Sequence, residues 1–328
     1  LQWQNVGNME NIGWEFNLNG NSIIKAGKFG ADFNVTFANN RNRVTAMDET
    51  CLASLNNEFN RSNGSYLSRV ELNYALGSIY GFRYKGVYQY SDYSAQEVPG
   101  VSGPNAPVVR DKDGIVILDE NQMTKPMMFC AGSVNYEFRG GDAIYDDVNY
   151  DGTIDELDIV YLGSSLPKVT GGWGFKLRYG RLSWNNQFNF RYGNKIINRA
   201  RMNVENMYSN NNQSRAVNWR WRVEGDLTEV PRALREHGYN WLGSDRFVED
   251  GSFIRLNYSQ LSYSFEPKVI KKLGLSQLNL YVSANNLFCL TKYSGADPEV
   301  SYGNLGIVTD NAQTPRSKSF TAGVTIQF

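Results

Sequence analysis

Apolar and polar residues alternate along much of this chain, which is the pattern of a β-strand with two unlike faces. The clearest example ends the sequence, where every second residue from Phe320 to Phe328 is apolar and the residues between them are Thr, Gly, Thr and Gln. Two further alternating segments, 173–179 and 182–192, are separated only by Gly180-Arg181. The pattern predicts a tight hairpin at that point.

Similar segments recur often enough to predict about ten strands. The others lie at 12–20, 28–39, 66–76, 78–91, 131–138, 252–265 and 278–285. Within 252–265 the apolar phase shifts between Tyr258 and Leu261, as a β-bulge would require. Some connections are short, whereas 92–130, 139–170 and 194–251 are long. Short turns on one side and long loops on the other are typical of an outer-membrane barrel.

Two all-β folds fit this alternation, and the character of the two faces favours one of them. The polar face carries Lys, Arg, Asn and Gln, as expected for a hydrated lumen, and aromatic residues gather at strand ends like the girdle of a barrel. The girdle candidates are Tyr80, Tyr88, Tyr90, Trp173 and Tyr192. We therefore predict a transmembrane antiparallel β-barrel with long extracellular loops. The alternative is a secreted β-sandwich that binds glycans and carries a calcium loop.

Charge and candidate catalytic residues narrow the possible functions. Lys plus Arg equals Asp plus Glu, at 33 each, so the chain has no basic excess to neutralise a phosphate backbone and nucleic acid is not an expected partner. His237 is the only histidine. It has no partner motif, and no pair of carboxylates is singled out as a general acid and base. The sequence does not predict an enzyme.

Four segments, in this order, resemble a known family. Residues 5–15 (NVGNMENIGWE) and 76–82 (LGSIYGF) resemble two strand motifs of the SusC-like branch of the TonB-dependent nutrient transporters. Residues 141–155 (GDAIYDDVNYDGTID) are similar to a longer family segment, and 244–256 (SDRFVEDGSFIRL) lead to further matching motifs at 285–288 and 297–299.

This resemblance implies active import of a nutrient, either an oligosaccharide or a peptide, across the bacterial outer membrane. It implies a SusD-like surface lipoprotein as partner, outer-membrane lipid around the barrel, and energy from TonB. Family barrels have about 22 strands around a plug. We therefore expect residues 1–328 to be the C-terminal part of such a barrel, with the plug, the TonB-contacting segment and the first strands in an N-terminal part or a second chain.

An acidic segment has the spacing of a calcium-binding loop. The order D-x-N-x-D-G-T-I-D-x-x-D places oxygens at positions 1, 3, 5, 7, 9 and 12 around a turn-forming glycine. The candidate ligands are Asp147, Asn149, Asp151, Thr153, Asp155 and Asp158. Calcium would pin a long extracellular loop; an acidic surface turn without metal is the other interpretation.

Two further candidates come from the longest connection and from the end of the sequence. The residues Trp219, Arg220, Trp221, Arg222 and Asp226 could contact a glycan or the lid, because aromatic rings stack on sugars and Arg serves hydroxyl groups. Loop packing explains the same residues and is favoured. Phe328, at the end of an alternating strand, resembles the signal that the barrel-assembly machinery recognises; it would also serve as a lipid-facing residue.

Overall fold

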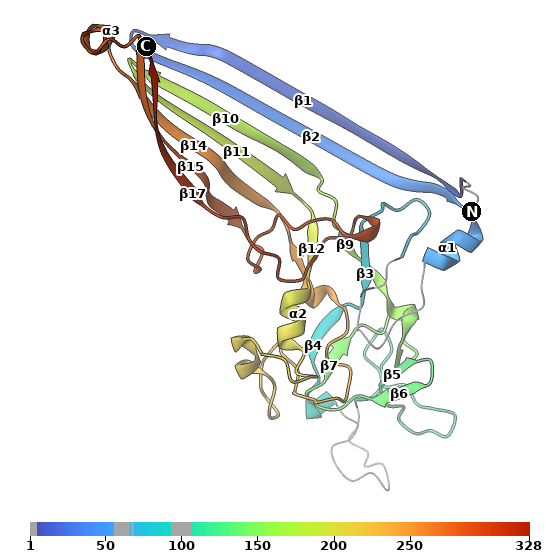
Figure 1. The fold of residues 1–328 in the computed structure, drawn as a ribbon. Helices are drawn as coiled ribbons and strands as arrows, with labels where there is room; N and C mark the ends of the chain where they lie inside the picture. The colour runs from blue at the N-terminus through green and yellow to red at the C-terminus, as the bar shows by residue number, and fades with distance from the viewer. Residues whose placement is uncertain (1–4, 56–65, 67–68, 93–106) are drawn as a thin grey trace, which may run out of the picture.

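A computed structural model describes residues 5–55, 66, 69–92 and 107–328. Its main feature is an antiparallel sheet with the strand order β1-β2-β10-β11-β14-β15-β17. The seven strands run side by side as one wall (Figure 1). They are β1 (Gly7–Ala26), β2 (Phe29–Met47), β10 (Val169–Tyr179), β11 (Leu182–Tyr192), β14 (Phe253–Ser264), β15 (Gln277–Thr291) and β17 (Ser319–Gln327).

The connections of this sheet are short at one end and long at the other, as predicted. Gly27-Lys28 joins β1 to β2, and Gly180-Arg181 joins β10 to β11, with both glycines at positive φ. The pairing of Tyr179 with Leu182 confirms the predicted hairpin. The segment 265–276 also lies at this end and contains α3 (Pro267–Ile270) and η6 (Lys271–Leu273). At the opposite end, 48–168, 193–252 and 292–318 form the long connections.

The two faces of the sheet differ in polarity, as two neighbouring rows of paired residues show. One row across β11, β14, β15 and β17 is Asn185, Gln260, Ser283 and Thr321, and the neighbouring row is Trp184, Leu261, Val282 and Ala322. On the second face Leu261 is 48% exposed and Val282 57% exposed. Extended exposed apolar surface of this kind requires an apolar surrounding. This face is therefore the lipid face, and the polar face lines the lumen.

A bulge in β14 is also confirmed, although it lies slightly before the predicted place. The register against β15 shifts between Leu256 and Tyr258, and the register against β11 shifts at the same point. The extra residue lets Ile254 and Leu256 share a face with Leu261 and Tyr263.

The long connections fold into a packed unit, which we call the surface body and define as residues 69–92, 107–168 and 193–252. Figure 1 shows it at the long-connection end of the sheet. Its elements, with those of the flanking connections, are α1 (Glu49–Leu55), β3 (Ser78–Gly81), β4 (Tyr84–Val87), η2 (Tyr90–Asp92), β5 (Met128–Ala131), β6 (Val134–Glu137), β7 (Ala143–Tyr145), β8 (Thr153–Ile154), η3 (Glu156–Asp158), β9 (Val160–Ser164), β12 (Lys195–Asn198), α2 (Arg199–Glu205), η4 (Arg215–Trp219), η5 (Asp245–Phe247), β13 (Val248–Asp250), η7 (Asn304–Gly306) and β16 (Thr309–Asp310). None of the helices in the described residues combines the length and apolar character needed to cross a membrane.

Three strands expected in the barrel wall are absent from it. Segments 78–91 and 131–138 contribute short strands to the surface body, and the described residues of 66–76 form turns and irregular structure; 67 and 68 lie outside the described residues. All four residues of β3 are buried, so this strand has no lipid face. Tyr80 and Tyr88, expected in the aromatic girdle, are buried in the core of the surface body instead. Of the other girdle candidates, Trp173 and Tyr192 do lie on wall strands, whereas Tyr90 lies in η2.

The arrangement also decides between the two predicted folds. Beside the seven-stranded sheet, the sheets of the described residues have only two or three strands. The secreted β-sandwich, which needs two large sheets face to face, does not fit. One large sheet with an apolar and a polar face fits the wall of a transmembrane barrel.

Candidate functional site

The lumen face of the wall holds the 292–318 connection through a cluster of buried charges. Arg255, on β14, contacts Asp297 at 2.6 Å and Glu299 at 2.7 Å, and Arg316 contacts Glu299 at 3.1 Å. The side chains of Arg255, Asp297 and Glu299 are almost fully buried. Breaking a buried ion pair by removing one partner is costly. The connection is therefore fixed to the wall.

A second cluster of charges joins the surface body to the same connection. Arg201 and Glu205 of α2 pair at 3.0 Å, and Arg246 reaches Glu205 at 2.7 Å. Arg201 also pairs with Glu249 of β13 at 3.2 Å. Glu249 accepts hydrogen bonds from the backbone N–H and hydroxyl of Ser294. Burial raises the pKa of Glu249, but these hydrogen bonds and Arg201 lower it by more. The net pKa of Glu249 therefore lies below the usual value.

Asp142 is the polar centre of the surface body. Its carboxylate is fully buried and pairs with Arg232 at 2.7 Å. Tyr136 donates its hydroxyl to this carboxylate at 2.8 Å, and the Asn240 amide donates to it at 3.2 Å. Asn240 in turn accepts from the backbone N–H of Ala143. The four side chains hold β6, β7 and the 231–242 segment together.

The acidic loop adopts the sharp turn that its sequence predicts. Gly152 has φ +84°, and Asp147 accepts from the Gly152 N–H at 2.8 Å. Asn149 accepts from the Asp151 N–H, and Asp151 accepts from the Thr153 N–H at 2.7 Å. The side-chain oxygens of the first three candidate ligands thus accept hydrogen bonds from backbone N–H groups, as in a series of Asx turns.

The last two candidate ligands close the loop as a capping box. Asp155 accepts from the Leu157 N–H, and Asp158 accepts from the N–H groups of Asp155 and Val148. Asp158 is fully buried, and this burial raises its pKa to about 6. Burial also raises the pKa of Asp147. Within the described part of the chain, no three His, Cys, Asp or Glu side chains form a ready metal-binding group. Calcium binding by the loop stays a prediction.

The two tryptophans of the 219–226 cluster have opposite environments. Trp221 is buried, donates its ring N–H to Gln89 at 3.1 Å, and packs edge-on against Tyr90. Its ring also lies on Gly141, where a β-carbon would clash. Trp221 thus packs inside the surface body, and a contact of this cluster with a glycan or the lid stays a prediction. Trp219 is 73% exposed.

The rest of that cluster forms turns. Arg220 and Arg222 donate to the backbone carbonyls of Val217 and Asn218, and Asp226 accepts from the N–H groups of Arg222 and Val223. Two neighbours that the sequence did not single out, Val223 and Leu227, are 61% and 98% exposed. Trp219, Val223 and Leu227 form an exposed apolar set, which we call the loop tip.

The chain is similar to curated proteins over its whole length. No family model matches it. It is 28% identical to TonB-dependent receptor P3 and 29% identical to TonB-dependent receptor P39, both of Formosa agariphila, over 100% and 99% of the chain. It is 24% identical to TonB-dependent receptor SusC of Bacteroides thetaiotaomicron over 99% of the chain. The chain is a homologue of the SusC-like TonB-dependent receptors.

Solved structures support the same fold for this SusC-like chain. It is similar to the RagAB peptide transporter (TM-score 0.67, 24% identity) and to the RagAB peptide importer in its closed-closed state (TM-score 0.66, 23% identity). Both matches cover 100% of the chain and 30% of the other chain, and the SusC-like chain spans 27% to 31% of the curated relatives. The SusC-like chain is thus part of an outer-membrane β-barrel.

Phe328 of the SusC-like chain lies directly after β17 and is 90% exposed. Its backbone carbonyl accepts a hydrogen bond from the Ser276 hydroxyl. The side chain is available to a partner, and its role as an assembly signal stays a prediction.

Proposed function

We propose that this SusC-like chain forms the C-terminal part of the barrel of a TonB-dependent importer, which carries an oligosaccharide or a peptide across the bacterial outer membrane. One observation carries the proposal: a seven-stranded wall with an exposed apolar face and a polar lumen face. Within the described residues, β1 and β17 each pair on one side only. A closed barrel has no free strand edge. Further strands, paired with β1 and β17, would therefore close the barrel.

The partners follow from this division. The N-terminal part would supply the plug and the first strands, and TonB would act through that part. A SusD-like lipoprotein would cover the end of the barrel that carries the surface body, because the long connections of such barrels are extracellular. The two clusters of charges support the proposal, since they would hold a fixed extracellular platform for a lid.

We assign the lid contact to the loop tip. Trp219, Val223 and Leu227 are exposed apolar residues on the 193–252 connection. Exposed apolar residues close in sequence on one connection are a candidate protein-binding surface, and Trp is frequent at the centre of such surfaces.

Co-purification with the full-length receptor tests the partner. The tagged receptor, extracted in detergent from its own outer membrane, should bring a lipoprotein with it. The double variant W219A/L227S should lose most of that lipoprotein. V269S is the matched control, because Val269 is an exposed apolar residue in α3 at the opposite end of the sheet. Full retention by W219A/L227S would refute the assignment of the loop tip.

Uptake measurements test the transport function itself. Cells lacking the receptor should fail to take up at least one member of a panel of labelled oligosaccharides and peptides. Wild-type receptor should restore this uptake only when TonB is present. Unchanged uptake of every compound in the receptor-deficient cells would contradict the proposed function.

A further inference from the structure

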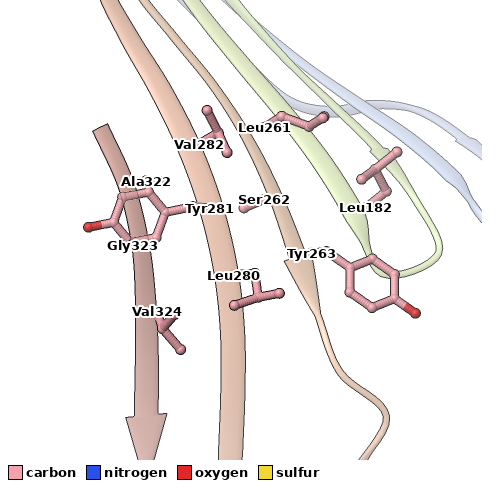
Figure 2. A pocket seen from close by; sticks show the side chains of 10 residues that line it. All are labelled: Leu182, Leu261, Ser262, Tyr263, Leu280, Tyr281, Val282, Ala322, Gly323 and Val324. Atoms are coloured by element: carbon pink, nitrogen blue, oxygen red, sulfur yellow. The ribbon is translucent and has the colours of Figure 1, made fainter. Parts of the chain in front are cut away.

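The lipid face of the wall contains a groove near the short-turn end. It has a volume of about 410 Å³ and is lined mostly by apolar side chains of β11, β14, β15 and β17. Figure 2 shows the side chains around it: Leu182, Leu261, Tyr263, Leu280, Val282 and Val324. All of these are exposed in the described structure.

Small residues explain why the surface is hollow at this place. Leu182, Tyr263, Leu280 and Val324 form one row across the four strands. In the adjoining row, the larger Leu261 and Val282 are paired, and the next residue across the sheet, on β17, is Ala322. A methyl group there leaves room that a larger side chain would fill. On the lumen face the Tyr281 ring packs against Gly323 and closes the floor of the groove.

The connections next to the groove are strongly basic. Segments 25–28, 180–181 and 265–276 together contain six Lys or Arg residues and one acidic residue, although the whole chain has 33 of each sign. Arg181 directly precedes Leu182 of the groove. Lys268, Lys271 and Lys272 lie in the connection that joins β14, which carries Tyr263, to β15, which carries Leu280. All four are exposed.

The acidic groups at this end leave the positive charge largely uncompensated. Glu266 lies 3.8 Å from Arg181, and Asp32 pairs with Arg178 on the lumen face at 2.8 Å. The three lysines of 265–276 have no carboxylate within ion-pair distance among the described residues. An apolar groove that ends at a free basic cluster is complementary to a molecule with a long apolar chain and an anionic head.

We propose that the groove and the 265–276 connection bind one anionic phospholipid of the periplasmic leaflet. An acyl chain lies along Leu261, Leu280 and Val282. The phosphate lies beside Arg181 and the three lysines. The short connections of an outer-membrane barrel face the periplasm, which places this basic cluster at the head groups of that leaflet.

Native mass spectrometry of the full-length receptor tests the site. The receptor in detergent is mixed with equal amounts of phosphatidylglycerol and phosphatidylcholine that carry the same acyl chains. Wild type should retain phosphatidylglycerol about fivefold more than phosphatidylcholine. K268Q/K271Q/K272Q should bring this ratio close to one, whereas K85Q/K112Q/K292Q, at the opposite end, should leave it unchanged.

A second variant tests the groove separately from the charges. A322F should reduce the retention of both lipids by more than half, because the ring fills the hollow. A31F, a similar change on the lipid face of β2, should leave retention as in wild type. Equal retention of the two lipids by wild type, an unchanged ratio in the triple lysine variant, or unchanged retention in A322F would each overturn the proposal. None of these readouts depends on cargo uptake, so the lipid site and the proposed function can fail independently.

Discussion

Asp142 shows how one residue can organise the surface body. It is a fully buried carboxylate whose charge is balanced by Arg232 and whose oxygens accept from Tyr136 and Asn240. A buried carboxylate is stable only when such partners are present. The partners come from segments up to 98 residues away in the sequence, so this one side chain joins remote parts of the chain.

Replacing Asp142 with Ala should destabilise the surface body by about 3–5 kcal/mol, because Arg232 would lose its buried partner. Hydrogen exchange of β6 and β7 in the full-length receptor measures the effect. D226A is the control, because Asp226 caps an exposed turn by accepting from two backbone N–H groups. Equal protection of wild type and D142A would contradict this role.

Calcium binding to the acidic loop can be tested at single residues. We expect millimolar or tighter binding in isothermal titration of the full-length receptor, and D151N should weaken it about tenfold or more by removing a ligand charge. D111N is the matched control, since Asp111 accepts from the N–H groups of Asp113 and Ile115 in a similar turn. No heat of binding in wild type at millimolar calcium would reject the site.

Residue roles were only partly predictable from the sequence. Trp219 and Trp221 share the same local sequence, yet one is exposed and the other is buried on Gly141. The local sequence did not reveal that Asp142 pairs with Arg232, because Arg232 lies 90 residues away. The turn of the acidic loop was predictable, since its hydrogen bonds join residues at most five apart in its first half.

At the scale of elements, alternation predicted the wall strands because each has lipid on one side and water on the other. The same pattern misled at 78–91 and 131–138. There the short strands belong to the core of the surface body, where Phe82, Phe129 and Tyr136 are buried. Apolar residues in such strands pack into a protein core instead of facing lipid. A short apolar run of this kind cannot be distinguished by its period from a strand with one exposed face.

Phe328 and Phe320 allow a matched test of the assembly signal. Both are exposed aromatic residues at opposite ends of the last strand segment, with exposed fractions of 90% and 70%. Phe328 lies beyond the paired residues of β17, so F328A should leave the sheet intact. We expect F328A to lower the amount of receptor in the outer membrane several-fold and F320A to lower it far less. Immunoblots of membrane fractions measure this, and equal levels for the two variants would refute the signal.

At the scale of the whole molecule, the two edge strands determine how the chain behaves alone. β1 has 20 residues and β17 has nine, and each offers one side of its backbone without a partner in the described residues. Free edges of this length pair with other chains. We therefore expect that strands from elsewhere close the barrel.

The 328-residue chain, produced alone and refolded in detergent, should give mixed oligomers without heat-modifiable migration in gels. The full-length receptor should run as a compact species that shifts on heating. Size-exclusion chromatography with light scattering gives the oligomeric state. A monodisperse, heat-modifiable monomer of the 328-residue chain would contradict the proposed incomplete barrel.

The wall strands β2 and β10 are neighbours, although residues 48–168 lie between them in the sequence. Those residues include most of the core of the surface body. Pairing over so long a separation is slow, because the chain must close a large loop first. If the surface body is extracellular, as proposed, we expect the intervening segment to cross the membrane before β2 and β10 join. Mutations that make this segment fold early would delay insertion, even if they stabilise the finished protein.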